Sequence, residues 1–168
     1  MINIENYRIK KKMGSSLRRF VRGNLINLND ACSNPVIQYV GLSRTDFREY
    51  LEYQFLEGMS WGNYCSEWVI DHIAPLRLFN LHKETDLCLC WGFLNMMPMW
   101  KSQNKIKGDS LDFAKIELLR RIEAAPSSVA LQQLLDKITV EESHHSQYQY
   151  PLDFLRFYTK VNYHNGSD

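Results

Sequence analysis

Two stretches of this chain decide its fold: WVIDHIAPL at 68–76 and NMMPMWKSQNKIKGD at 95–109. The first is a run of apolar and β-branched residues, which predicts one short strand. Asp71 and His72 interrupt the run, and such groups are costly in an apolar strand unless each has a partner. Taken alone, a pair of this kind is more often structural than catalytic, so its meaning depends on its surroundings.

The second stretch predicts a short helix. Pro98 can occupy the first helical turn and Gly108 can end the helix. Trp100 and Asn104 are four residues apart and would lie on one face, with the tryptophan anchoring the helix beside the strand. The lysines of this helix are expected to remain free for phosphates: Lys101, Lys105 and Lys107.

The geometry of the first stretch raises one difficulty. Neighbouring residues of a regular strand point to opposite faces, so Asp71 and His72 can serve one site only where the strand bends or ends. Pro75 fits such an interruption. A second short extended piece is predicted at 89–94.

Helices are predicted on both sides of these stretches. One begins at Ser15 or Ser16, and a second is capped by Ser43 and stops at Gly58. Their apolar faces carry, respectively, Leu17, Phe20, Val21, Leu25 and Leu28, and Phe47, Tyr50, Leu51 and Phe55. Three more helices are predicted at 112–125, 129–138 and 152–161. The expected fold class is therefore α+β, in a mostly helical single domain.

Length and composition agree with one globular domain. The chain has 168 residues, of which 45% are hydrophobic and 23% are charged. No apolar run approaches the roughly 18 residues of a membrane span, and the N-terminus does not resemble a secretory signal. We therefore expect a cytoplasmic protein without membrane association, whose cysteines are free thiols: Cys32, Cys65, Cys88 and Cys90.

Metal-binding patterns outside the central stretches are weak. The cysteines do not form the paired C-x-x-C knuckles of a structural zinc site. His144 and His145 lie in the polar run EESHHSQYQ at 141–149, where a solvent-exposed linker is the favoured interpretation. No small-molecule cofactor is indicated.

Positive charge is concentrated, although the net charge is only +1. Residues 1–24 contain seven basic residues against one Glu, and a second basic stretch covers 100–121. Such clustering is typical of contact with a polyanion such as nucleic acid, but solvated helix faces explain it equally well. The candidate phosphate contacts of the N-terminal arm are Lys10, Lys11, Lys12, Arg18, Arg19 and Arg22.

Four segments together resemble the HNH endonucleases, especially the compact phage and homing type. They are GLS at 41–43, QFLEGMSWGNY at 54–64, WVIDHIAP at 68–75 and NMMPMWKSQNKIKGD at 95–109. The resemblance covers about residues 39–109. It implies a nuclease core over 39–109, preceded by a basic helical arm (1–38) and followed by a C-terminal helical extension (110–168).

The resemblance also implies a ββα-metal module, in which a hairpin and a helix hold one divalent cation. His72 would be the general base and Asp71 a metal ligand, while Asn95 would fix the hairpin loop and the orientation of His72. Asn104 stands where the strict pattern has its final His, and would be the second metal ligand. Histidine suits proton transfer near neutral pH, and these two oxygen donors favour Mg²⁺ or Mn²⁺.

The sequence thus predicts a metal-dependent DNA endonuclease acting on double-stranded DNA. The alternative is a DNA-binding module that has kept the HNH fold without cleavage. With one site per chain and no heptad pattern, we expect a monomer that nicks duplex DNA, a dimer being the alternative. The resemblance to the phage type also implies a phage-encoded protein that acts in the cytoplasm of a bacterial host.

Overall fold

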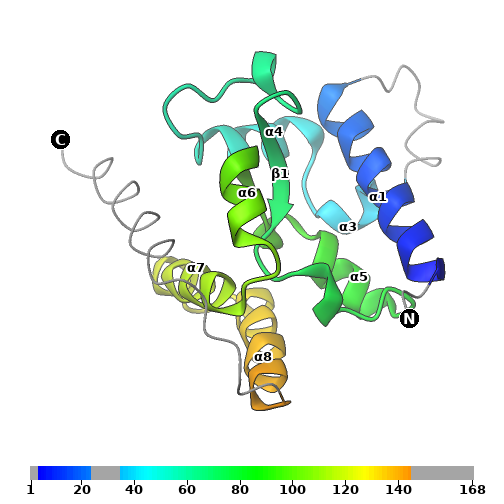
Figure 1. The fold of residues 1–168 in the computed structure, drawn as a ribbon, viewed down its shortest axis with the longest axis vertical. Helices are drawn as coiled ribbons and strands as arrows, with labels where there is room; N and C mark the ends of the chain where they lie inside the picture. Colours follow the sequence, from blue (N-terminus) through cyan, green and yellow to red (C-terminus); the bar gives the residue numbers. More distant parts are fainter. Residues whose placement is uncertain (1–3, 24–34, 145–168) are drawn as a thin grey trace.

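The computed structural model describes residues 4–23 and 35–144 of the chain. These residues form a mostly helical structure with one two-stranded antiparallel sheet, which confirms the α+β class. Figure 1 shows helices α1 and α6 on either side of strand β1, with α7 and α8 packed together at one end. No helix in the described ranges is long and apolar enough to cross a membrane.

Helix α1 (Ile4–Arg22) is longer than the sequence analysis predicted. It begins well before Ser15, because Ile9 and Met13 extend the apolar stripe of Leu17 backwards at intervals of four residues. Ser16 is buried, and its hydroxyl accepts a hydrogen bond from the backbone N–H of Val36 at 3.3 Å. Phe20 and Val21 are buried as predicted, whereas Leu25 and Leu28 lie outside the described residues.

A short helix, α3 (Ile37–Val40), precedes α4 (Arg44–Glu52). The predicted cap of α4 is confirmed, since the Ser43 hydroxyl accepts a hydrogen bond from the Asp46 N–H at 3.2 Å. The predicted stop at Gly58 is wrong, because α4 ends at Glu52. After α4 the chain turns back, and Phe55 packs against Trp68 of β1 with ring centroids 4.8 Å apart.

The sheet consists of β1 (Trp68–His72) and β2 (Met96–Trp100), paired from Trp68↔Trp100 to His72↔Met96. The first strand was predicted. The second was misplaced: residues 89–94 fall in helix α5 (Glu84–Trp91) and the 3₁₀ turn Phe93–Asn95.

Pro98 lies in β2 and does not begin a helix, which corrects the prediction for 95–109. A two-stranded sheet has a free edge on each strand, so a residue without a backbone N–H is tolerated there. Helix α6 (Lys101–Lys107) follows β2 directly and ends at Gly108, as predicted.

The C-terminal part of the described structure is a helix pair, α7 (Leu111–Ala124) and α8 (Val129–His144). Both predicted starts are confirmed to within one residue. Helix α8 continues beyond the predicted end, so residues 141–144 of the expected linker are helical. Two ion pairs hold this last turn, Arg77–Glu141 at 2.5 Å and Lys115–Glu142 at 2.6 Å. The predicted helix at 152–161 and His145 lie outside the described residues.

One cluster of buried apolar side chains extends through the described structure. Its largest fully buried members include Trp68, Trp91, Phe47 and Phe113, from β1, α5, α4 and α7. Three of the cysteines are free thiols, as predicted, while Cys32 lies outside the described residues. The core therefore fixes the two strands and the surrounding helices to one another.

Glu117 is a buried charge that anchors α7. Only 1% of it is exposed, and Oε1 accepts hydrogen bonds from Arg120 and Arg121, each at 2.7 Å. Arg121 also contacts the hydroxyl of Tyr50, which links α7 to α4. Burial raises the pKa of the Glu117 carboxyl, but the two arginines outweigh it, so its pKa is lowered from the ordinary value.

We predict that Glu117→Gln lowers the free energy of unfolding at pH 7 by about 1–3 kcal/mol. A lowered folded-state pKa means that the carboxylate stabilises the fold above its unfolded pKa and loses this contribution as the pH falls through the folded value. The variant should therefore lose less stability than the wild type on acidification from pH 6 to 3. Urea unfolding at several pH values measures this, with Glu123→Gln, an exposed site on α7, as control. Parallel curves of unfolding free energy against pH for Glu117→Gln and the wild type would contradict this prediction.

Candidate functional site

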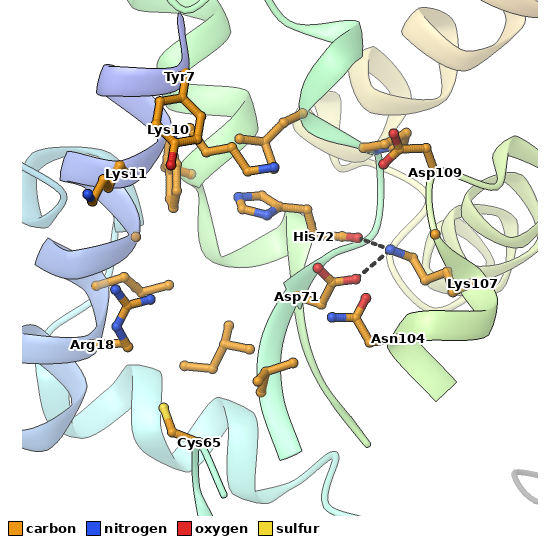
Figure 2. Close-up of a pocket in the computed structure, with 18 of the residues that line it drawn as sticks. Tyr7, Lys10, Lys11, Arg18, Cys65, Asp71, His72, Asn104, Lys107 and Asp109 are labelled. Atoms are coloured by element: carbon orange, nitrogen blue, oxygen red, sulfur yellow. Dashed lines mark hydrogen bonds and ion pairs between the residues drawn. The ribbon is translucent and has the colours of Figure 1, made fainter. Parts of the chain in front are cut away.

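A cleft of about 560 Å³ lies between α1 and the β1–α6 region. Figure 2 shows its two walls: Tyr7, Lys10, Lys11 and Arg18 belong to α1, and Asp71, His72 and Asn104 face them from β1 and α6. These residues are far apart in sequence, so the fold alone creates the cleft.

The cleft brings together much of the predicted site. Asp71, His72 and Asn104 all line it, together with Lys10, Lys11, Arg18 and Lys107. The other predicted phosphate contacts do not line it and are exposed elsewhere: Lys12, Arg19, Arg22, Lys101 and Lys105. Asn95 does not line the cleft and is fully buried.

Asn95 joins the end of β1 to the segment before β2. Its Oδ1 accepts a hydrogen bond from the Ala74 N–H at 2.8 Å, and its Nδ2 donates to the carbonyls of Ala74 and Cys90 at 3.3 and 3.0 Å. Its own carbonyl accepts from the Ile73 N–H at 2.8 Å. These bonds fix the chain where it leaves the strand, directly after His72. The strand therefore ends directly after His72, as was expected if Asp71 and His72 are to serve one site.

His72 is enclosed at the floor of the cleft, with 8% of the residue exposed. Its ring stands edge-on to Trp91, with centroids 4.7 Å apart and planes at 85°. Within the described residues its Nε2 has no hydrogen-bond partner. Burial lowers the pKa of His72 from 6.5 to about 4; Asp71 opposes this, and Lys107 and Lys10 reinforce it. The imidazole is therefore neutral at neutral pH, which leaves one ring nitrogen unprotonated, while the lowered pKa makes that nitrogen a weaker base than a free imidazole.

Lys107 is not free, which corrects the prediction for this residue. Its side chain is 2% exposed, and its Nζ lies 2.5 Å from Oδ2 of Asp71. Nζ also donates a hydrogen bond to the backbone carbonyl of His72 at 2.8 Å. Lys107 therefore contacts the two central residues of the site, and its ammonium group is paired with protein oxygens and not free for phosphates.

The donors of the cleft fit a small hard cation. Asp71 offers a carboxylate with 20% of its side chain exposed, and Figure 2 shows the amide of Asn104 beside it. The described residues contain no cluster of three or more His, Cys, Asp or Glu side chains suited to a metal. A cation here would thus have two protein oxygens, with water and phosphate completing the shell, as Mg²⁺ and Mn²⁺ accept.

Two residues of the cleft were not predicted from the sequence. Tyr7 lines it from the first turns of α1, and Trp91 packs against His72 from α5. The recurrence of Ile9 and Met13 ahead of Leu17 could have extended α1 and so placed Tyr7 on the helix. No local pattern predicts the contact of Trp91 with His72, because it depends on how α5 packs against the strand.

No protein-family model and no solved structure matches this chain. Two curated proteins of Acanthamoeba polyphaga mimivirus are similar to it. "Uncharacterized protein L426" is 34% identical over 106 residues, which cover 63% of this chain and 44% of that protein. "Uncharacterized protein L246" is 26% identical over 124 residues, which cover 72% and 55%. The chain thus spans about half the length of these relatives, and their names assign no activity.

We predict that Asn95→Ala lowers the free energy of unfolding by about 2–4 kcal/mol, because it leaves buried backbone groups of Ala74 and Cys90 without partners. Urea unfolding measures the change. Asn80→Ala is the matched control, since Asn80 is exposed and its side chain accepts one backbone hydrogen bond, from His82 at 3.1 Å. The control should cost about 1 kcal/mol or less. Equal losses in the two variants would show that Asn95 does not hold this turn.

Proposed function

We propose that this protein is a metal-dependent DNA endonuclease whose β1, β2 and α6 form an HNH-type ββα module. The observation that carries the proposal is that Asp71, His72 and Asn104 line one cleft, opposite a basic helix. The two strands are antiparallel, and α6 follows β2 and packs on both of them. The order of two antiparallel strands followed by a helix agrees with the ββα arrangement that the HNH resemblance implies.

The cleft residues would have different roles in phosphodiester hydrolysis. His72, neutral and with a free ring nitrogen, takes a proton from the attacking water. Asp71 and Asn104 would hold the divalent cation, which when bound supplies charge stabilisation at the phosphate. Asn95 fixes the end of β1 and so holds His72 in place. Lys10, Lys11 and Arg18 line the opposite wall with positive charge, where phosphate oxygens would lie.

The substrate in this proposal is double-stranded DNA, and the product is a nick. The described residues contain one site of this kind, made by Asp71, His72 and Asn104, and one such site attacks one strand. The positive charge of the cleft wall continues along the exposed side of α1, outside the cleft. The residues that carry it there would contact neighbouring phosphates, and they are Lys12, Arg19 and Arg22. Cleavage by a monomer therefore follows from the proposal.

We predict that the protein converts supercoiled plasmid to the nicked form in Mg²⁺ or Mn²⁺ and is inactive in excess EDTA. His72→Ala should lower the cleavage rate by about 10²–10⁴, because it removes the proton acceptor while leaving the basic surface unchanged. Fluorescence anisotropy with a labelled duplex should give nearly equal affinities for the variant and the wild type. DNA binding without cleavage in any divalent cation would favour the non-catalytic DNA-binding module.

A second prediction separates the cleft from the rest of the basic helix. Lys10 and Lys12 are both exposed on α1, but only Lys10 lines the cleft, and Figure 2 shows it extending towards His72. Lys10→Met should lower the single-turnover nicking rate about 10- to 100-fold, because it removes positive charge near the reacting phosphate. Lys12→Met should change that rate little.

Both substitutions remove one positive charge, so each should weaken DNA binding and reduce its salt dependence by about one charge. Lys12→Met therefore controls for affinity. Equal nicking rates for the two variants at saturating DNA would exclude a role for Lys10 at the reacting centre.

A further inference from the structure

Lys107 is the lysine of α6 that points inward, and its environment is unusual for this residue type. Lys101 and Lys105 on the same helix are exposed, whereas the Lys107 side chain is 2% exposed. A buried ammonium group is costly unless it is paired and hydrogen-bonded. Here Nζ has two oxygen partners, Asp71 Oδ2 and the His72 carbonyl, and it lies 5.6 Å from the centre of the Phe113 ring.

These partners lie at the centre of the site. The carboxylate of Asp71 is the one charged oxygen donor that the proposed function assigns to the cation. Lys107 holds one of its two oxygens and, through the His72 carbonyl, the end of β1. The position of Asp71 is therefore fixed by an internal cation, without a metal.

The pair also changes the charge that an incoming cation meets. Among the residues that the structure describes, two carboxylates line the cleft, Asp71 and Asp109. Four basic side chains line it as well: Lys10, Lys11, Arg18 and Lys107. The ammonium of Lys107 touches the very carboxylate that a divalent cation would use, so it repels that cation at short range. The cleft as a whole thus attracts phosphate more readily than a free cation.

We propose that Lys107 is a built-in counter-ion of Asp71, a positioning residue that keeps the carboxylate in place without metal and weakens cation binding by the DNA-free protein. This inference rests on the proposed function, because that function makes Asp71 a metal ligand. It concerns a residue that the HNH-like motif had suggested as a phosphate contact. A purely structural role, anchoring α6 to β1, makes a different prediction for cation binding.

The test compares Lys107→Met with Lys105→Met, which removes the same charge from an exposed position of the same helix. Mn²⁺ binding to DNA-free protein is measured by electron paramagnetic resonance of the free ion, and melting temperatures are recorded in EDTA and across a Mn²⁺ titration. We expect Lys107→Met to bind Mn²⁺ about tenfold or more tightly than the wild type. It should melt lower in EDTA and recover as Mn²⁺ replaces the lost counter-ion. Lys105→Met should match the wild type in both measurements.

Equal Mn²⁺ affinity for Lys107→Met and Lys105→Met, or weaker binding by Lys107→Met, would overturn the inference. If Lys107→Met is unfolded in EDTA, Mn²⁺ should restore its helical circular dichroism. A failure of Mn²⁺ to restore it would also overturn the inference.

A second pair of variants tests the ion pair without metal. Asp71→Asn leaves the Lys107 ammonium buried beside a neutral amide, so adding Lys107→Met should raise the melting temperature in EDTA. A lower melting temperature for the double variant would show that the two charges do not depend on each other.

The two proposals can fail separately. Wild-type protein that neither binds Mn²⁺ nor nicks DNA would overturn the proposed function, and with it the inference about Lys107. Normal nicking with unchanged Mn²⁺ affinity in Lys107→Met would overturn this inference alone.

Discussion

The side chain of Asn95 supports the central part of this structure. A sheet of two strands is marginal in water, and here the strands are separated by more than twenty residues of chain. The amide of Asn95 binds backbone groups near both ends of this connecting segment, at Ala74 after β1 and at Cys90 in α5. Because the amide is fully buried, water does not compete for these bonds. The end of β1, and with it His72, is held in one place.

Charge is arranged around this fixed strand in two layers. The outer layer is the basic side of α1, exposed to solvent and suited to long-range attraction of a polyanion. The inner layer is the pair between Lys107 and Asp71, which is largely removed from water and therefore acts over a short distance. The outer charges would govern association with DNA, while the inner pair governs the state of the carboxylate before DNA arrives. The two layers can be altered separately, because the outer charges lie on α1 and the inner pair lies on β1 and α6.

The candidate site was predictable to the extent that it lies in short stretches of sequence. Asp71 and His72 interrupt a strand pattern, and the HNH-like motif adds Asn104, which the fold brings into the same cleft. The environment of these residues was not predictable. The burial that lowers the pKa of His72 comes from tertiary packing. Lys107 was expected to be free for phosphates, like Lys101 and Lys105, but the packing of α6 on β1 places its ammonium group against Asp71.

Local sequence was enough to predict β1, the Ser43 cap of α4 and the starts of α7 and α8, because each depends on side chains within about one turn or one strand. The other elements depend on tertiary contacts. Residues 96–100, including Pro98, become a strand because β1 offers an edge to pair with, although their local signals favoured a helix start. Residues 89–94 have apolar residues suited to either state, and packing in the core selects helix. These outcomes depend on contacts between residues far apart in the chain, which local patterns do not encode.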